Sequence, residues 1–137
     1  MKFLLDTHIL IWSLKDPAKL PVPIKTALDD EKNELWLSPI SVWEMMLLAE
    51  KGRAKLRTNN PGKWFRNALA SLPIKEAPIT HEVAIRSREI DLPHQDPADR
   101  FILATTLVFD LVLMTVDQKL IDSKYNGTIF GGQQWQK

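Results

Sequence analysis

Four acidic side chains lie beside or inside apolar segments of this 137-residue chain: Asp6, Glu44, Asp99 and Asp117. A carboxylate in apolar surroundings is costly to bury unless it is paired or coordinates a metal ion. If these four share one cleft, they repel one another and raise each other's pKa unless cations neutralise them. Mg²⁺ and Mn²⁺ prefer such oxygen ligands. A site of this kind suits phosphodiester hydrolysis, because the metal activates a water molecule and stabilises charge on the leaving oxygen.

The elements around these acids are predicted to bring them to one edge of a sheet. Asp6 and Asp117 each follow an apolar run, so each comes at the end of a predicted buried strand. Glu44 and Asp99 lie in the early turns of apolar helices. The predicted order, β-α-α-β-α-α-α-β-α-α-β-α-β, indicates an α/β fold with a mainly parallel central sheet flanked by helices on both faces. In such sheets ligands gather at the carboxyl ends of the strands.

Prolines, glycines and capping residues set the bounds of the predicted elements. The predicted strands span residues 3–5, 34–38, 72–77, 111–116 and 128–130. The predicted helices span residues 24–32, 38–49 and 118–121, two helices are separated by a turn at 59–62, and others begin after Asp6, Thr80 and Asp96. The chain is therefore predicted to form one domain over residues 1–130, with a flexible tail at 131–137.

Three of these four acids also have a purely structural interpretation. Asp6 or Thr7 suits the N-cap of the helix that begins there. Glu44 either reaches solvent or pairs with an arginine, or it faces the same cleft as Asp6. Asp96 is placed as a helix cap, and Asp99 follows three residues later as in a capping box. The structural and functional interpretations of this last pair are compatible, with Asp96 as the cap and Asp99 as the metal ligand.

A basic segment that contains two aromatic residues lies between residues 51 and 66. It holds no acid, and its cations are Lys51, Arg53, Lys55, Arg57, Lys63 and Arg66. Six cations beside aromatic rings suit contact with a phosphate backbone. Two alternatives are open: a solvated helical hairpin whose Trp64 and Phe65 pack inward, and a docking surface for a protein partner.

Composition narrows the classes of protein to consider. The formal net charge is +1, so any nucleic-acid binding must come from local patches rather than from the whole chain. The chain has no cysteine, which excludes disulfides and thiolate metal sites and fits a reducing compartment. Asp6 and His8 interrupt the N-terminal apolar run, so no signal peptide is expected, and no apolar run reaches the ~18 residues of a membrane span. We expect a cytoplasmic protein.

Four segments, in order and at matching spacing, resemble the PIN-domain ribonucleases, and within them the VapC-type toxins of type II toxin–antitoxin pairs. These segments are LLDTHILIW at 4–12, SVWEM at 41–45, HQDPADRFILATT at 94–106 and LMTVD at 113–117. The third is the most specific, because it is similar to the His-x-Asp-Pro-x-Asp-Arg signature of one subgroup. Position 98 is alanine where that subgroup often has phenylalanine, a difference expected to alter packing rather than chemistry.

The resemblance implies a PIN-like fold and an endoribonuclease that depends on Mg²⁺, with Mn²⁺ as a possible substitute. The family's acidic quartet maps onto Asp6, Glu44, Asp99 and Asp117. Members of the family commonly form dimers and are silenced by a cognate antitoxin that binds across the helical region near the site. By similarity, the basic segment 51–66 lies in that region, which favours a partner-binding or RNA-binding surface.

Several further residues are weaker candidates for the site. Thr115, two residues before Asp117, either hydrogen-bonds a ligating carboxylate or is an ordinary strand threonine. Arg100 either pairs with the acid cluster or holds a scissile phosphate, or it forms a plain ion pair with Asp96 or Glu44. His94 either lines the cleft or is exposed in a loop. His8 is not counted as a ligand, because Mg²⁺ prefers oxygen.

Two other functions fit parts of the pattern. One is a different Mg²⁺-dependent phosphoryl hydrolase, such as a structure-specific DNA nuclease or a phosphatase. A phosphatase with an aspartyl nucleophile would carry Asp-x-Asp after its first strand, whereas this chain has Asp6-Thr7-His8. The second is a degenerate PIN domain that only binds RNA or a protein, although four mutually repelling carboxylates would have no use there.

Overall fold

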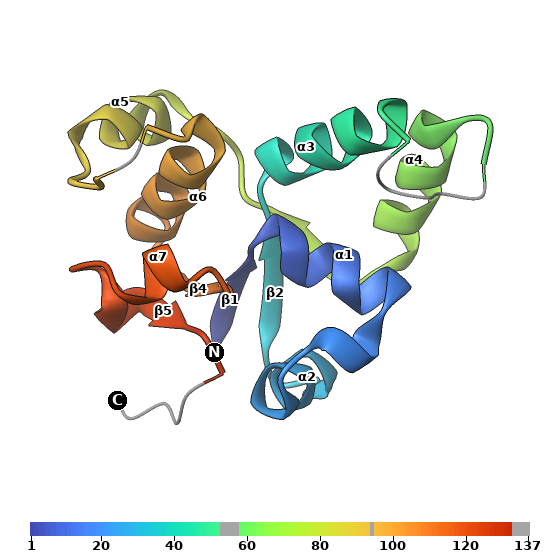
Figure 1. The fold of residues 1–137 in the computed structure, drawn as a ribbon, viewed down its shortest axis with the longest axis horizontal. Coiled ribbons are helices and arrows are strands. Elements are labelled where there is room, and N and C mark those ends of the chain that lie inside the picture. The colour runs from blue at the N-terminus through green and yellow to red at the C-terminus, as the bar shows by residue number, and fades with distance from the viewer. Residues whose placement is uncertain (53–57, 94, 133–137) are drawn as a thin grey trace.

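Five parallel strands form one sheet in the computed structural model, which describes residues 1–52, 58–93 and 95–132 (Figure 1). The strands are β1 (Lys2–Leu5), β2 (Glu34–Leu37), β3 (Ile74–Glu76), β4 (Val112–Met114) and β5 (Ile129–Phe130). Their order is β3-β2-β1-β4-β5, and every neighbouring pair is parallel. All five carboxyl ends therefore lie at the same edge, and β1 is central. The predicted α/β fold with a parallel sheet is confirmed.

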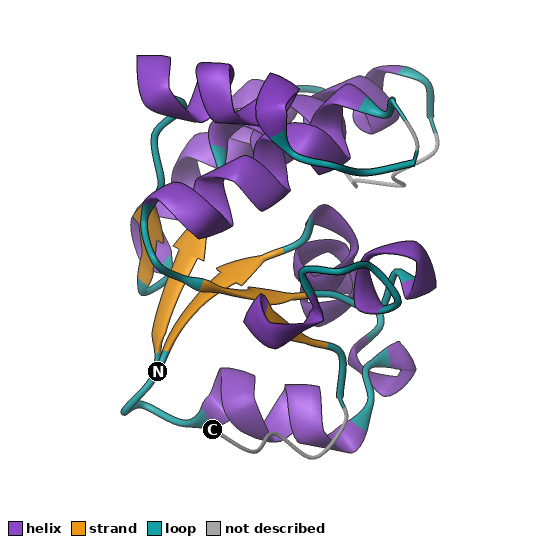
Figure 2. Ribbon diagram, turned by 90° about the vertical axis from the view of Figure 1, so that its left-hand side faces the viewer, coloured by secondary structure: helices purple, strands orange, loops and turns teal. Residues whose placement is uncertain are grey.

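Seven α-helices occur in the described residues. They are α1 (Thr7–Lys15), α2 (Val22–Asp29), α3 (Pro39–Glu50), α4 (Pro61–Ser71), α5 (His81–Glu89), α6 (Pro97–Val108) and α7 (Gln118–Ile121). In Figure 1, α1 to α4 lie to the right of β1 and β2, and α5 to α7 lie to the left. Figure 2 shows the strands running through the middle of the molecule with helices above and below. No helix in the described part of the chain has the length and apolar character needed to cross a membrane.

Two hydrophobic cores follow from the alternation of side chains along β1. Phe3 and Leu5 point to one face, where they join a cluster with side chains of α1, α2, α3 and α4. Leu4 points to the other face, where it joins a cluster with side chains of α6 and α7. Since successive strand residues face opposite sides, a wholly apolar strand such as β1 must be covered on both faces.

The predicted caps are confirmed at three helices. Each cap side chain accepts a hydrogen bond from a backbone N–H of the first turn: Ser38 from Ile40 at 3.1 Å, Thr80 from Val83 at 3.2 Å and Asp96 from Ala98 at 3.0 Å. Proline occupies the first position of α3 and α6, where no backbone donor is required. These caps fix where α3 and α6 begin, and thus how Glu44 and Asp99 are aimed.

The second helix differs from its prediction. It was expected over residues 24–32, but α2 begins at Val22 and ends at Asp29. Pro23 lies within its first turn, where proline is tolerated because its missing N–H has no helical partner. The predicted helix therefore began two residues too late and ended three residues too late.

Two other predictions are answered only in part. Three helices were expected between β2 and β3; the described residues there form α3 and α4, and residues 53–57 lie outside the described part.

The tail was expected to begin at residue 131. Gly132 lies in this predicted tail and has a φ of +89°. A Cβ atom at this position would lie 3.2 Å from Pro21 Cβ, so the backbone here lies close to the Pro21 side chain. Residues 133–137 are outside the described part, so the domain boundary stays a prediction.

Arg100 ties α6 to the end of α5. Its side chain is 4% exposed, and Nε donates to the Ser87 carbonyl at 2.8 Å while Nη2 donates to the Ile90 carbonyl at 2.7 Å. These carbonyls belong to the last turn of α5 and its C-cap, which lack helical donors. The guanidinium thus holds the first turn of α6, with Asp96 and Asp99, against α5.

We expect Arg100→Met to lower the free energy of unfolding by about 3 kcal/mol, because two buried carbonyls lose charged donors. Urea denaturation of the variant and the wild type measures this loss. Exposed Arg88→Met on α5 is the matched control, and it should change stability little. If Arg100→Met keeps wild-type stability but loses activity, Arg100 acts in the site instead of in the fold.

Candidate active site

Asp6 lies at the carboxyl end of the central strand and is 6% exposed. Its backbone N–H donates to the Met114 carbonyl at 3.0 Å, so Asp6 continues the pairing of β1 with β4. Its Oδ1 accepts from the Thr7 N–H at 2.7 Å, which caps α1. Its Oδ2 accepts from the Thr115 hydroxyl at 2.6 Å. Asp6 is therefore both the cap of α1 and part of a buried polar cluster, and the two interpretations of this residue are compatible.

Glu44 reaches the same cluster from α3. The Thr7 hydroxyl donates to Glu44 Oε1 at 2.6 Å, and Ser41 Oγ lies 2.9 Å from Thr7 Oγ1. The side chain of Glu44 is only partly exposed. Glu44 is therefore close enough to Asp6 for the Asp6 charge to raise the pKa of Glu44, whereas a shared cleft for the two acids stays a prediction.

Asp117 is joined to Asp6 through Thr115. The Asp117 N–H donates to Thr115 Oγ1 at 3.0 Å, and the Thr115 hydroxyl donates onward to Asp6. The Asp117 carboxylate accepts from the Lys119 N–H at 3.0 Å and caps α7. Thr115 thus hydrogen-bonds the Asp6 carboxylate and couples the ends of β1 and β4, whereas the role of Asp6 as a metal ligand stays a prediction.

A cavity of about 260 Å³ opens beside these residues. It is lined by Asp6, His8, Trp12, Val116 and Asp117. His8 is exposed and packs edge-on against Trp12, with the ring centroids 6.1 Å apart. A small polar ligand therefore has access to the carboxylates at the ends of β1 and β4.

The first turn of α6 carries the remaining acids. Asp96 is exposed and caps the helix, and its charge is close enough to Glu44 to raise the pKa of Glu44. Asp99 is partly buried and lies three residues later, on the same face of the helix as Asp96. The start of α6 is thus adjacent to the Glu44 side of the cluster.

Burial and crowding of negative charge raise the pKa of two carboxyl groups. For Asp6 the main cause is burial, to which the Asp117 charge adds, while the hydrogen bonds from Thr115 and Thr7 and the proximity of His8 act in the opposite direction. For Glu44 the main cause is again burial; the charges of Asp6 and Asp96 add to it, and the Thr7 hydrogen bond opposes it. A cation at the cluster would favour the ionised form of both groups.

The donor set fits a hydrated divalent cation. The side chains that converge are oxygen donors, which suit Mg²⁺ or Mn²⁺. Across residues 1–52, 58–93 and 95–132, no three His, Asp or Glu side chains already meet at one point where an ion would sit. Mg²⁺ usually keeps several waters and binds through one or two carboxylates, so a closed protein cage is not required.

The other predicted residues are placed as follows. Lys51 follows α3, and Lys63 and Arg66 lie on α4; all three are exposed. Arg53, Lys55, Arg57 and His94 lie outside the described residues. Arg100 bonds to α5 carbonyls, as described above.

Sequence reasoning missed Thr7 and Ser41 as parts of the site. Thr7 was considered only as a cap, yet its hydroxyl contacts Glu44. Ser41 is fully buried and precedes Glu44 by three residues, so both lie on one side of α3. The sequence did contain a signal for Ser41, because its small hydroxyl side chain comes one turn before Glu44, the only acid in this apolar stretch of helix.

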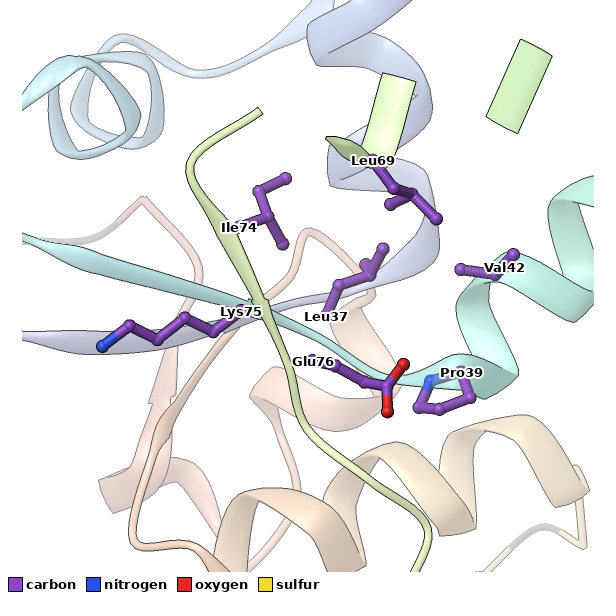
Figure 3. A pocket seen from close by; sticks show the side chains of 7 residues that line it. All are labelled: Leu37, Pro39, Val42, Leu69, Ile74, Lys75 and Glu76. Atoms are coloured by element: carbon purple, nitrogen blue, oxygen red, sulfur yellow. The ribbon is translucent and has the colours of Figure 1, made fainter. Parts of the chain in front are cut away.

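A second cavity, of about 210 Å³, lies between β2, β3, α3 and α4, and none of the predicted acids lines it. Its lining is mainly aliphatic, from Leu37, Pro39, Val42, Leu69 and Ile74. In Figure 3 the Lys75 side chain extends away from this lining, whereas the Glu76 carboxylate lies beside Pro39. This cavity suits an apolar group rather than a metal ion.

Sequence comparison identifies relatives over most of the chain. The family model of the PIN domain matches residues 3–124. Ribonuclease VapC22 of Mycobacterium tuberculosis is 32% identical over 120 residues, which cover 85% of this chain and 88% of that protein. The resemblance that rests on the four sequence segments is therefore confirmed.

Solved structures share the fold. VapBC2 from Rickettsia felis, bound to a DNA fragment from its promoter, superposes with a TM-score of 0.64 at 16% identity, covering 88% of this chain and 91% of that one. A toxin–antitoxin complex from Klebsiella pneumoniae gives a TM-score of 0.63 at 23% identity, covering 96% and 98%. The fold thus extends over nearly the whole chain.

Proposed function

Because the chain belongs to the PIN-domain family, we propose that it is a divalent-metal-dependent endoribonuclease that acts as the toxin of a toxin–antitoxin pair. Its 32% identity to a protein named as a ribonuclease supports nuclease activity. The toxin–antitoxin complexes among its structural neighbours support the second part of the proposal. The proposed metal is Mg²⁺, with Mn²⁺ as a substitute.

One observation carries the proposal: a continuous chain of hydrogen bonds links acids from three elements. It runs from the Asp117 N–H through Thr115 to Asp6, and from Thr7 to Glu44. The pKa of Asp6 and of Glu44 is raised, so the cluster is unfavourable without a counter-charge. A protein gains little from such an arrangement unless the acids hold a cation.

Asp6, Glu44, Asp99 and Asp117 would hold the metal, which would activate water and stabilise the leaving oxygen. Thr115 and Thr7 keep the Asp6 carboxylate in one orientation, with hydrogen bonds to both of its oxygens. The position of Asp6 at the end of the central strand fixes its backbone, because strand pairing continues through its N–H. Rigid placement of charge is the main contribution that a protein makes to this kind of catalysis.

The test is cleavage of single-stranded RNA by the purified, antitoxin-free protein, with Mg²⁺ or Mn²⁺ and with a chelator. Flapped DNA and a phosphate monoester are assayed in parallel. Metal-dependent cleavage of RNA alone supports the proposal. Preferred cleavage of DNA or the monoester points to another phosphoryl hydrolase. Absence of both cleavage and metal binding by calorimetry, together with retained partner binding, points to a binding-only domain.

The proposed antitoxin has apolar surface available near α4. The cavity of Figure 3 borders α4 at Leu69, and a second apolar cavity of about 220 Å³ lies among residues of α1, α2, β2 and the segment before β3. Leu14 of α1 lines this second cavity and is 37% exposed. Apolar cavities suit the apolar anchors of a protein partner, and the exposed Lys63 and Arg66 of α4 suit acidic residues on it.

We expect charge reversal at Lys63 and Arg66 of α4 to weaken RNA or antitoxin binding without changing the catalytic step. If both cations contact phosphate, the slope of log affinity against log salt falls by about 1 for each. Fluorescence anisotropy over a salt series measures this slope, with exposed Lys25→Glu on α2 as control. Unchanged affinity for RNA and antitoxin alike would remove this surface from the proposal.

We also propose a homodimer, as the family resemblance implies. Trp43 of α3 is 57% exposed and Ile79 is 38% exposed, so both are candidates for an interface. Sedimentation equilibrium of the wild type and of Trp43→Ser tests this assignment.

A further inference from the structure

We propose that Thr7, oriented by Ser41, is a positioning residue that sets the Glu44 carboxylate for metal binding; this inference rests on the proposed metal-dependent function. Thr7 is 2% exposed and Ser41 is 0% exposed, so water does not satisfy their hydroxyls. Glu44, by contrast, is partly exposed and would otherwise be free to rotate towards solvent.

The direction of these hydrogen bonds follows from counting protons. Thr7 Oγ1 lies 2.6 Å from Glu44 Oε1 and 2.9 Å from Ser41 Oγ. A carboxylate only accepts, so the single hydroxyl proton of Thr7 goes to Glu44. Ser41 must then donate to Thr7. Ser41 thereby fixes the Thr7 hydroxyl, and Thr7 fixes one oxygen of Glu44.

This arrangement leaves Glu44 Oε2 for a ligand. Within the described residues, Oε1 is the Glu44 oxygen that accepts a hydrogen bond. At Asp6 a threonine hydroxyl also holds the carboxylate, because Thr115 donates to Oδ2, while Oδ1 accepts from the Thr7 backbone N–H. Two buried threonine hydroxyls therefore hold two acids, from β1 and from α3, in fixed relative positions.

The hydroxyl of Thr7 is separable from the other role of the residue. Capping of α1 uses the backbone N–H of Thr7, which any residue except proline supplies. Valine has nearly the shape of threonine and would fill the same buried space without the donor. Serine keeps the donor without the methyl group. The two substitutions therefore separate hydrogen bonding from packing.

The experiment compares Thr7→Val, Thr7→Ser and Ser41→Ala with the wild type. For each protein, Mn²⁺ affinity is measured by electron paramagnetic resonance without RNA, and kcat and KM are measured for RNA cleavage. Thr106→Val is the matched control, since Thr106 is also fully buried but donates to the Ile102 carbonyl within α6. Thermal unfolding without metal shows which variants are folded.

Thr7→Val should weaken Mn²⁺ binding and lower kcat, each by about 10- to 100-fold, the usual effect of losing a hydrogen bond to a metal ligand. KM should change little, Ser41→Ala should show a smaller loss, and Thr7→Ser and Thr106→Val should stay near the wild type. If Thr7→Val folds and retains Mn²⁺ affinity and kcat, or if Thr7→Ser loses as much as Thr7→Val, the inference is wrong. If Thr7→Val does not fold, the test rests on Ser41→Ala: a folded Ser41→Ala protein that retains wild-type Mn²⁺ affinity and kcat shows that the inference is wrong. A wild type that neither binds Mn²⁺ nor cleaves RNA overturns the proposed function itself.

Discussion

Asp99→Asn is expected to lower metal-dependent RNA cleavage by about 10²- to 10³-fold, the range seen when one group that stabilises transition-state charge is removed. Asparagine keeps the size of the side chain and one oxygen, but it removes the negative charge that a divalent cation requires. Asp99 lies in the first turn of α6, three residues after Asp96, whose charge raises the pKa of Glu44. The fold should persist, because Asp96 supplies the cap hydrogen bond at the start of α6.

Cleavage rates at saturating Mg²⁺ and the Mn²⁺-induced rise in melting temperature measure this effect together. An ion that binds only the folded state at 100 times its Kd adds about 2.7 kcal/mol of stability, and this gain should shrink in Asp99→Asn. Asp29→Asn, at the exposed end of α2, is the matched control. A fully active Asp99→Asn protein would exclude Asp99 as a ligand.

Asp6→Asn is expected to abolish cleavage and yet to stabilise the metal-free protein increasingly as the pH rises. The pKa of Asp6 is raised from its ordinary value of 3.8, chiefly by burial and further by Asp117. A carboxyl group whose pKa is higher in the folded than in the unfolded state favours folding below the unfolded pKa. That contribution is lost as the pH rises through the folded pKa. At a pH above both pKa values, each unit of difference between the folded-state and unfolded-state pKa lowers the free energy of unfolding by about 1.4 kcal/mol.

The measurement is urea denaturation of both proteins in chelator from about pH 4 to pH 7. The difference in unfolding free energy, variant minus wild type, should become more positive across this range and then level off. Titrating groups that do not interact with Asp6 cancel in the difference, and the repulsion between Asp6 and Glu44 acts in the same direction as the Asp6 shift. Saturating Mg²⁺ should reverse the order, because only the wild type gains from the ion. A difference that is flat with pH would show that Asp6 carries no unfavourable charge in the folded protein.

Much of the fold could be predicted because its signals are local. Buried parallel strands are continuously apolar, and helix caps are short polar side chains at known offsets. The strand at residues 3–5 and the caps Ser38, Thr80 and Asp96 are of this kind. The start of α2 was wrong because Pro23 is compatible with both a turn and a first helical turn. That choice depends on packing of Ile24 into the core, which no local pattern shows.

The sequence by itself determined which acids lie at strand ends and helix starts, since these positions depend on residues a few places apart. Only the tertiary structure decided how the acids are joined. Asp6 and Thr115 are 109 residues apart, and Thr7 and Glu44 are 37 apart, yet each pair is bonded at 2.6 Å. The register of β1 with β4 and the packing of α1 on α3 create these contacts. The register between distant segments is set by burial of whole faces of strands and helices, which no local pattern shows. The roles of Thr7, Ser41 and Arg100 therefore became visible only in the folded chain.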